Sequence, residues 1–361
     1  MIIERQKMEE NNKTTKKLEE KLDSLFSSQS YPDFDSSAII EKTLAKIHSE
    51  RRRCHIQMWW LSSLSLAASV LIGVVIYYFV NATDKIGNMD FYQIAENVSS
   101  AIYESNEVVL ITPEDELQFP NKSFIQYNGK GEITVNGNVI ETGKTNGRNS
   151  LTQIIVPVGK KADLQLSDGT RLMLNSRSRV MFPQSFDGKE RKIFAEGEVY
   201  MEVSHDKSHP FVVESSDFNL RVLGTKFNIS TYKELGKTEI VLLEGAVEVA
   251  DINNEQKALL APDELLNVKD GRIAGRCHVD AEDYISWTKG WLNLKGMSLS
   301  EVMNRLGILY GVDITCNESV ASKRIYGKLE LKDNLNDILY NIQQIIPVQI
   351  NTSEQGIELI K

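Results

Sequence analysis

The hydrophobic residues of this chain are unevenly distributed, and their longest run lies at residues 59–80. No charged side chain occurs between positions 58 and 83. As a helix that rises about 1.5 Å per residue, this run would extend roughly 33 Å, which matches the hydrocarbon thickness of a bilayer. The pattern predicts one transmembrane helix at residues 58–80. Aromatic side chains stand at both ends, where the membrane interfaces would be: Trp59, Trp60, Tyr77 and Tyr78.

Positive charge is concentrated on one side of this run. Lys46, Arg51, Arg52 and Arg53 precede it, whereas only Lys85 follows within a similar distance. This asymmetry predicts a cytoplasmic N-terminus. The alternatives are a buried core helix, which seldom runs so long without a charge, and a cleaved signal peptide, whose apolar core is shorter and nearer the N-terminus. The arginines could also bind anionic lipid or nucleic acid, but the orientation of the span in the membrane is enough to explain their presence.

Residues 1–57 carry two apolar stripes at helical spacing, separated by a polar segment at residues 27–37. They predict two short amphipathic helices, which can hide little apolar surface against each other. We therefore expect them to bind a cytoplasmic protein by a helix-in-groove contact, with an idle tether as the alternative. The stripe residues are Leu18, Leu22, Leu25, Phe26, Ile40, Leu44 and Ile47.

After a polar stalk at residues 81–106, the pattern becomes short, alternating and rich in β-branched residues up to residue 278. Turn-forming pairs such as Asn136-Gly137 and Asp270-Gly271 separate the apolar runs. Asp168-Gly169 lies between two such runs, where a two-residue turn with positive φ angles would close a hairpin. The pattern predicts an antiparallel sandwich or β-roll over residues 107–278. Its clearest strands are residues 108–111, 132–135, 154–156, 162–166, 171–174, 211–213, 219–223 and 239–243.

The remaining segment, residues 279–361, contains an internal repeat. Residues 290–295 and 327–332 share a strand-like pattern, and each is followed by a helical apolar stripe and a second short strand. Ser298 and Glu301 have the spacing of a capping box at the start of the first helix. We expect an α+β domain of two β-α-β units, with two helices against one small sheet and a last strand at residues 357–360. The first stripe is Leu299, Val302, Met303, Leu306 and Leu309.

Composition and charge narrow the functional classes. The net charge of -9 argues against a nucleic-acid-binding protein, which needs a concentrated basic face. Three cysteines cannot form a disulfide framework. Cys277 and Cys316 both follow the predicted span, where a bridge between them is allowed, but two free, partly buried thiols are the preferred interpretation.

No pattern in the chain predicts catalysis, a cofactor or a metal site. His205 and His209 are four residues apart, but they lie in a segment that ends in a proline and is expected to be an exposed loop. Glu196, Glu198 and Glu202 have the spacing of one strand face, which we interpret as the solvent side of that strand. The sequence therefore predicts a protein that is not an enzyme.

Two alternatives of other classes stay open. Six N-x-[ST] sequons after the predicted span would suit a type II membrane glycosyltransferase, but the only DxD-like motif, Asp33-Phe34-Asp35, lies before the span. The other alternative is a purely structural envelope anchor.

Five blocks of sequence occur in a characteristic order. They are VPVG at residues 156–159, LQLSDGTRLMLNSRSRVMFPQSF at 164–186, EGEVYMEVSHDKSHPFVV at 196–213, VLGTKFNI at 222–229 and LLEGAVEV at 242–249. In this order they resemble the FecR family of membrane-bound anti-sigma factors. The family's usual glycine pair is Gly159-Lys160 here, and Met201 replaces a usual phenylalanine. The motif positions are Asp168, Gly169, Thr170, Leu174, Asn175, Gly197, Glu198, Pro210, Phe211, Gly224, Thr225, Phe227, Asn228, Glu244 and Gly245.

The segment from Trp287 resembles the C-terminal domain of the Bacteroidetes branch of that family, which is similar to the short N-terminal domain of secretins and TonB-dependent receptors. The resemblance implies a single-pass protein of the inner membrane with its C-terminus in the periplasm. It implies regulation of an extracytoplasmic-function sigma factor through residues 1–57. It also implies contact with the signalling domain of an outer-membrane TonB-dependent transporter for iron or glycan uptake.

Overall fold

The structure is a computed structural model that describes residues 105–128, 132–140, 151–353 and 356–361, together with the helical residues 16, 17, 20, 21 and 24. The chain divides into two compact units, Met1–Asn88 and Met89–Lys361. The predicted span, the amphipathic stripes and the arginines before the span lie outside the described residues. Among the residues that are described, no helix is long and apolar enough to cross a membrane.

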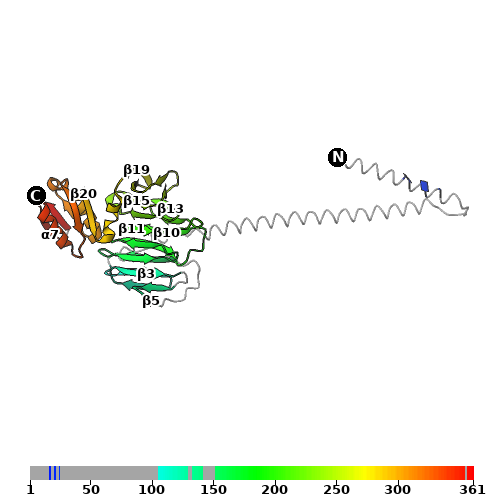
Figure 1. Ribbon diagram of the computed structural model, residues 1–361, viewed down its shortest axis with the longest axis horizontal. Helices are drawn as coiled ribbons and strands as arrows, with labels where there is room; N and C mark the ends of the chain where they lie inside the picture. The colour runs from blue at the N-terminus through cyan, green and yellow to red at the C-terminus, as the bar shows by residue number, and fades with distance from the viewer. Residues whose placement is uncertain are drawn as a thin grey trace. The chain divides into compact units, whose positions relative to one another are not determined.

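Two large β-sheets form most of the second unit (Figure 1). The first sheet has the spatial order β2 (Glu116–Phe119), β1 (Val108–Ile111), β6 (Leu151–Val156), β9 (Ser178–Pro183), β10 (Arg191–Glu196), β12 (Phe211–Glu214), β13 (Phe218–Val222), β16 (Val247–Asp251) and β17 (Lys257–Leu260). The second has the order β5 (Asn138–Ile140), β4 (Ile133–Val135), β3 (Ser123–Tyr127), β7 (Ala162–Gln165), β8 (Arg171–Leu174), β11 (Glu198–Glu202), β14 (Lys226–Ser230), β15 (Thr238–Glu244), β18 (Glu264–Lys269) and β19 (Arg272–His278).

The chain crosses repeatedly between these two sheets. Strand β10 lies in the first sheet, β11 in the second and β12 again in the first, where β12 pairs with β10 in parallel. From β6 onward, the spatial order of the strands in each sheet follows their order in the sequence. The chain therefore winds in successive coils, and each coil adds strands to both sheets beside those of the coil before it. We call this part, from β1 to β19, the sheet domain.

A single hydrophobic core lies between the two sheets. Alternate residues of each strand point into it, as the exposed-buried alternation of β8 illustrates. Its largest fully buried side chains include Phe182, Phe211, Phe218 and Phe227. The prediction of a mostly β structure is confirmed.

One predicted turn differs from expectation. Asn136-Gly137 and Asp270-Gly271 do have positive φ angles at both residues, as two-residue hairpin turns require. At Asp168-Gly169, however, only Gly169 has a positive φ. The Leu166 N–H donates to the Thr170 carbonyl at 2.9 Å, so the connection has three residues rather than two. The expectation was wrong because the side chain of Asp168 accepts the Thr170 N–H at 2.9 Å and stabilises a wider turn.

The last part of the chain, from α4 (Ala281–Tyr284), is the C-terminal domain. It continues with η3 (Ser286–Lys289), β20 (Trp291–Ser298), α5 (Leu299–Tyr310), β21 (Ile314–Cys316), α6 (Glu318–Ala321), β22 (Arg324–Glu330), α7 (Leu335–Ile345), β23 (Gln349–Ser353) and β24 (Gly356–Ile360). Ser298 and Glu301 form the capping box of α5. The apolar stripes of α5 and α7 lie in one hydrophobic cluster. The prediction of an α+β region is confirmed.

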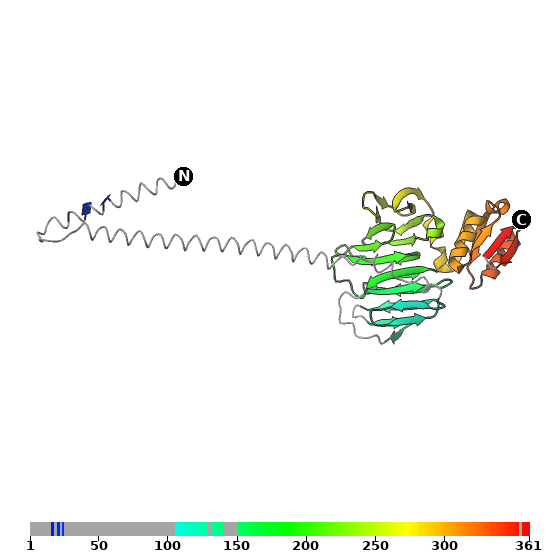
Figure 2. The ribbon, with the colours of Figure 1, turned by 180° about the vertical axis from the view of Figure 1, so that it is seen from behind.

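The expected single small sheet of this domain is wrong, because its strands form two separate sheets (Figure 2). β20 and β22, the first strands of the two repeats, pair with each other. The second strands, β21 and β23, are held apart by β24, which pairs in parallel with β21 and antiparallel with β23. Each of the two sheets therefore contains one strand from each repeat, and the last strand lies between the two second strands.

Candidate functional site

The sheet domain and the C-terminal domain meet in a continuous hydrophobic contact. Tyr200, Met173 and Leu243 of the second sheet pack into the apolar cluster of the C-terminal domain. A smaller cluster joins Val241 of β15 to Ala281 of α4. The two domains are thus packed together over side chains that neither could bury alone.

Polar contacts cross the same junction. The indole N–H of Trp287 donates to Asn228 Oδ1 at 3.3 Å, and the Ser176 hydroxyl donates to the carbonyl of Leu309 at 2.7 Å. Arg305 of α5 donates to Glu239 of β15 at 3.3 Å. Both side chains of this ion pair are largely shielded from water, at 24% and 6% exposure. These directional bonds fix one orientation of the domains, since each requires its partner on the other side.

Glu198 is a buried carboxylate at this junction. It is 7% exposed, and it accepts hydrogen bonds from the side-chain amides of Asn175 at 2.6 Å and Asn228 at 3.5 Å. Burial raises the pKa of Glu198, and the positive charge of Arg305 opposes that shift. Asn228 therefore connects the carboxylate to Trp287 of the other domain.

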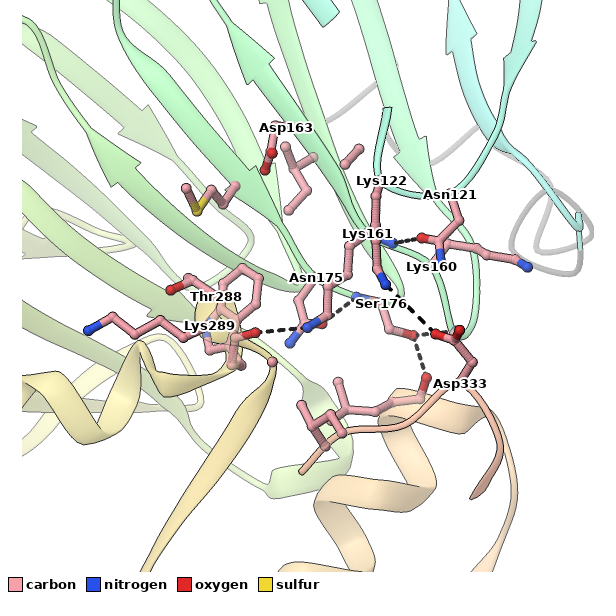
Figure 3. Close-up of a pocket in the computed structure, with 18 of the residues that line it drawn as sticks. Asn121, Lys122, Lys160, Lys161, Asp163, Asn175, Ser176, Thr288, Lys289 and Asp333 are labelled. Carbon is pink, nitrogen blue, oxygen red and sulfur yellow. Dashed lines mark hydrogen bonds and ion pairs between the residues drawn. The ribbon is translucent and has the colours of Figure 1, made fainter. Parts of the chain in front are cut away.

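A cleft of about 360 Å³ opens beside this network (Figure 3). Lys161 extends across it, and its ammonium group donates to the carbonyl of Trp287 at 2.8 Å and lies 5.5 Å from the centre of the indole ring. Burial lowers the pKa of Lys161. At the rim, Lys122 and Asp333 from the two domains form an ion pair at 3.8 Å. The cleft is therefore shaped by residues of both domains.

The motif positions predicted from sequence fall into separate groups in the sheet domain. The structure brings Asn175, Glu198 and Asn228 together at the junction. Leu174 and Phe227 belong to the hydrophobic core. Glu244 forms an exposed ion pair with Lys226.

A second group surrounds Arg191, which is buried at the start of β10 in the first sheet. The Arg191 guanidinium donates to Asp168 at 2.7 Å and lies 5.3 Å from the centre of the Phe211 ring. Asp168 in turn accepts the Thr170 hydroxyl at 2.7 Å, and the carbonyl of Pro210 accepts the backbone N–H of Arg191 at 2.8 Å. These motif residues hold the loop of Gly169 against the neighbouring strand.

Three motif glycines occupy crowded positions. A Cβ at Gly197 would lie 2.5 Å from the Cα of Ser178, and one at Gly224 would lie 2.5 Å from the ring of His205. A Cβ at Gly245 would lie 3.0 Å from the Gly224 carbonyl, next to Thr225. Each of these glycines also has a positive φ. Their role is to allow close passage of the backbone.

The prediction that Glu196, Glu198 and Glu202 share a solvent-facing strand side is wrong. Gly197, with a φ of +88°, carries the chain from one sheet to the other, so Glu196 ends β10 and Glu198 begins β11. Glu196 pairs with Arg179 in the first sheet, whereas Glu198 is buried. A two-residue period holds only along an unbroken strand.

The loop histidines and the two described cysteines form neither a metal-ligand cluster nor a disulfide within the described part of the chain. His209 pairs with Asp206 at 2.8 Å, and both His205 and His209 are exposed. Cys277 and Cys316 are free thiols. Cys316 is partly buried as expected, but Cys277 is exposed, because β19 lies at the edge of its sheet and presents nearly all its residues to solvent.

Sequence reasoning missed the residues that join the domains. Lys161 and Arg305 lie in no recognisable chemical motif. Trp287 carries one signal, because it begins the second region of resemblance. Their importance comes from contacts between segments far apart in the chain.

Comparisons with known proteins agree with this architecture. The family model described as FecR protein matches residues 152–248, and the model described as FecR, C-terminal matches residues 291–359. The first match lies within the sheet domain and the second within the C-terminal domain. No curated protein matches the chain.

Two crystal structures of a candidate anti-sigma factor from Parabacteroides distasonis, at 2.50 and 1.65 Å resolution, are similar to this chain. Each is 29% identical with a TM-score of 0.51. Each match covers 58% of this chain and 99% or 98% of the other.

Proposed function

Because the chain belongs to the FecR family of anti-sigma factors, we propose that it is a single-pass inner-membrane regulator of an extracytoplasmic-function sigma factor. The observation that carries the proposal is the similarity to the Parabacteroides structures over nearly their whole length. The apolar run at residues 59–80 and the preceding arginines support a cytoplasmic N-terminus and a periplasmic C-terminus.

In this proposal, residues 1–57 hold the sigma factor through the stripe that includes Leu22 and Leu25. The test is co-purification of the full-length chain with the sigma factor encoded beside its gene. Leu22→Asp with Leu25→Asp should abolish capture, because charge cannot enter an apolar groove. Lys16→Asp with Lys17→Asp is the matched control and should leave capture intact. No capture by the intact chain would refute the proposal.

On the periplasmic side, the proposed partner is the signalling domain of an outer-membrane TonB-dependent transporter. The apolar and polar contacts between the two domains support this role, since a partner that contacts either domain acts on both. A partner shifts a conformational equilibrium only as far as its affinities for the two states differ. This limits the conformational signal that a single transmembrane helix can carry. Regulated cleavage near the span would bypass that limit. Deleting the transporter's signalling domain should change sigma-dependent transcription, and unchanged transcription would contradict this step.

Membership of this family favours a regulatory protein over the glycosyltransferase alternative. The structural-anchor alternative makes a different prediction for gene deletion. Deletion of a regulator alters the transcripts that the sigma factor controls, whereas deletion of an anchor leaves them unchanged. RNA sequencing of the deletion strain distinguishes the two.

A further inference from the structure

We propose that the cleft between the sheet domain and the C-terminal domain binds a small organic anion that carries at least two negative charges. This inference goes beyond sigma-factor regulation, because it requires neither the sigma factor nor the transporter.

The first argument is the charge of the cleft. Five lysines line it, against two aspartates, in a chain whose net charge is -9. Two of the lysines are neutralised, Lys122 by Asp333 and Lys289 by Glu282. Within the described part of the chain, the other three form no ion pair, and Asp163 is the remaining acidic residue of the lining. These lysines are Lys160, Lys161 and Lys332.

The second argument is that the positive charge of the cleft is not fully exposed to water. Lys161 is partly buried between the two domains, and its pKa is lowered by desolvation. In the cleft, its ammonium group donates a hydrogen bond to a neutral carbonyl, that of Trp287. The negative charge of Glu198 opposes this shift, but among the described residues no carboxylate forms an ion pair with Lys161. An anion in the cleft would supply a closer opposite charge to this partly buried ammonium group.

The third argument is the shape and the remaining lining of the cleft. Its volume of about 360 Å³ lies in the usual range for small-molecule sites. Met173, Tyr310 and Leu331 of the lining are only partly buried and provide apolar surface for the carbon skeleton of a ligand. The charged lining contains lysine but no arginine, so charge rather than planar bidentate geometry selects the ligand.

Binding at this position would link the two domains. Lys160 and Lys161 precede β7 in the sheet domain, whereas Lys332 follows β22 in the C-terminal domain. An anion between them contacts both domains at once and stabilises their packing. The ligand should therefore raise the melting temperature of the protein, since it binds the folded form alone.

The test uses phthalate as the probe and benzoate as its singly charged comparison, because both present the same aromatic ring. Calorimetric titration of the full-length chain in non-ionic detergent should show phthalate binding at sub-millimolar concentration and much weaker binding of benzoate. Added salt should weaken phthalate binding. No phthalate binding at millimolar concentration, or equal affinity for both probes, would overturn the proposal.

Two double variants locate the site. Lys160→Gln with Lys332→Gln should weaken phthalate binding about tenfold or more. Lys207→Gln with Lys269→Gln removes the same charge from exposed positions outside the cleft and should leave the affinity unchanged. Unliganded melting temperatures report whether each variant is folded. Equal loss of affinity in the two double variants would show a general charge effect and would also overturn the proposal.

Discussion

The side-chain amide of Asn175 donates a 2.6 Å hydrogen bond to the carboxylate of Glu198, a group that is 7% exposed. The amide solvates part of the charge, but burial dominates and raises the pKa of Glu198. The folded protein consequently holds this proton more tightly than the unfolded chain does. Stability contributed by the group is present below the usual carboxyl pKa of 4.5 and is lost as the pH rises through the raised value.

Glu198→Gln should therefore raise the melting temperature at pH 8 and have little effect near pH 4.5. Glutamine keeps the hydrogen-bonding shape and removes the charge whose burial is unfavourable. Thermal unfolding followed by circular dichroism at the two pH values measures the effect. Glu330→Gln, at an exposed position, is the control and should show no such pH dependence. A lower melting temperature for Glu198→Gln at pH 8 would contradict this account.

Asp168→Ala should lower the free energy of unfolding by about 3–5 kcal/mol, because it leaves the buried guanidinium of Arg191 without its carboxylate. Urea denaturation gives the value. The exposed pair of Lys257 and Glu248 offers the comparison, and Glu248→Ala should cost no more than about 1 kcal/mol. Similar costs for the two variants would mean that Arg191 finds another partner.

Gly197→Ala should destabilise the sheet domain by about 3 kcal/mol, through positive φ and overlap with the backbone of Ser178. Gly137→Ala isolates the first effect: its φ is +83°, but nothing lies within 4 Å of the added Cβ. It should cost only about 1–2 kcal/mol. Chemical denaturation gives the loss of unfolding free energy for each variant. The extra loss in Gly197→Ala measures the close contact between Gly197 and Ser178 of β9. Equal losses in the two variants would show that the backbone moves apart to accept the added Cβ.

Leu306→Ala should destabilise the C-terminal domain by about 2–5 kcal/mol, because Leu306 is fully buried in the stripe of α5. Ile345→Ala, on the exposed side of α7 at 64% exposure, should change stability by less than about 1 kcal/mol. Hydrogen exchange of the C-terminal domain would reveal the loss locally. Normal protection in Leu306→Ala would show that this stripe is not essential to the fold.

Local patterns predicted local structure well. The capping box of Ser298 and Glu301 and the apolar stripe of α5 depend on residues three or four positions apart, and both occur as expected. The pairing of β20 with β22, and the insertion of β24 between β21 and β23, depend on competition among strands. A repeat in the sequence indicates similar units but does not decide which strands pair.

The candidate site could not be predicted in the same way. The Lys161 ammonium group and the Trp287 carbonyl are separated by 126 positions, and no pattern links them. The even spacing of Glu196, Glu198 and Glu202 predicts a solvent-facing Glu198 only where one straight strand continues through Gly197. One glycine with a positive φ moved the carboxylate to another sheet and into the junction. Such changes of direction decide burial, and only the folded chain reveals them.

The agreement between spatial and sequential strand order from β6 onward bears on how the protein folds. Most all-β domains fold slowly because their contacts join distant segments. Here each coil lays its strands on the coil made just before it, so the entropy of closing long loops is largely avoided. During synthesis, the growing chain can lengthen both sheets one coil at a time, with each finished edge as the template for the next strands.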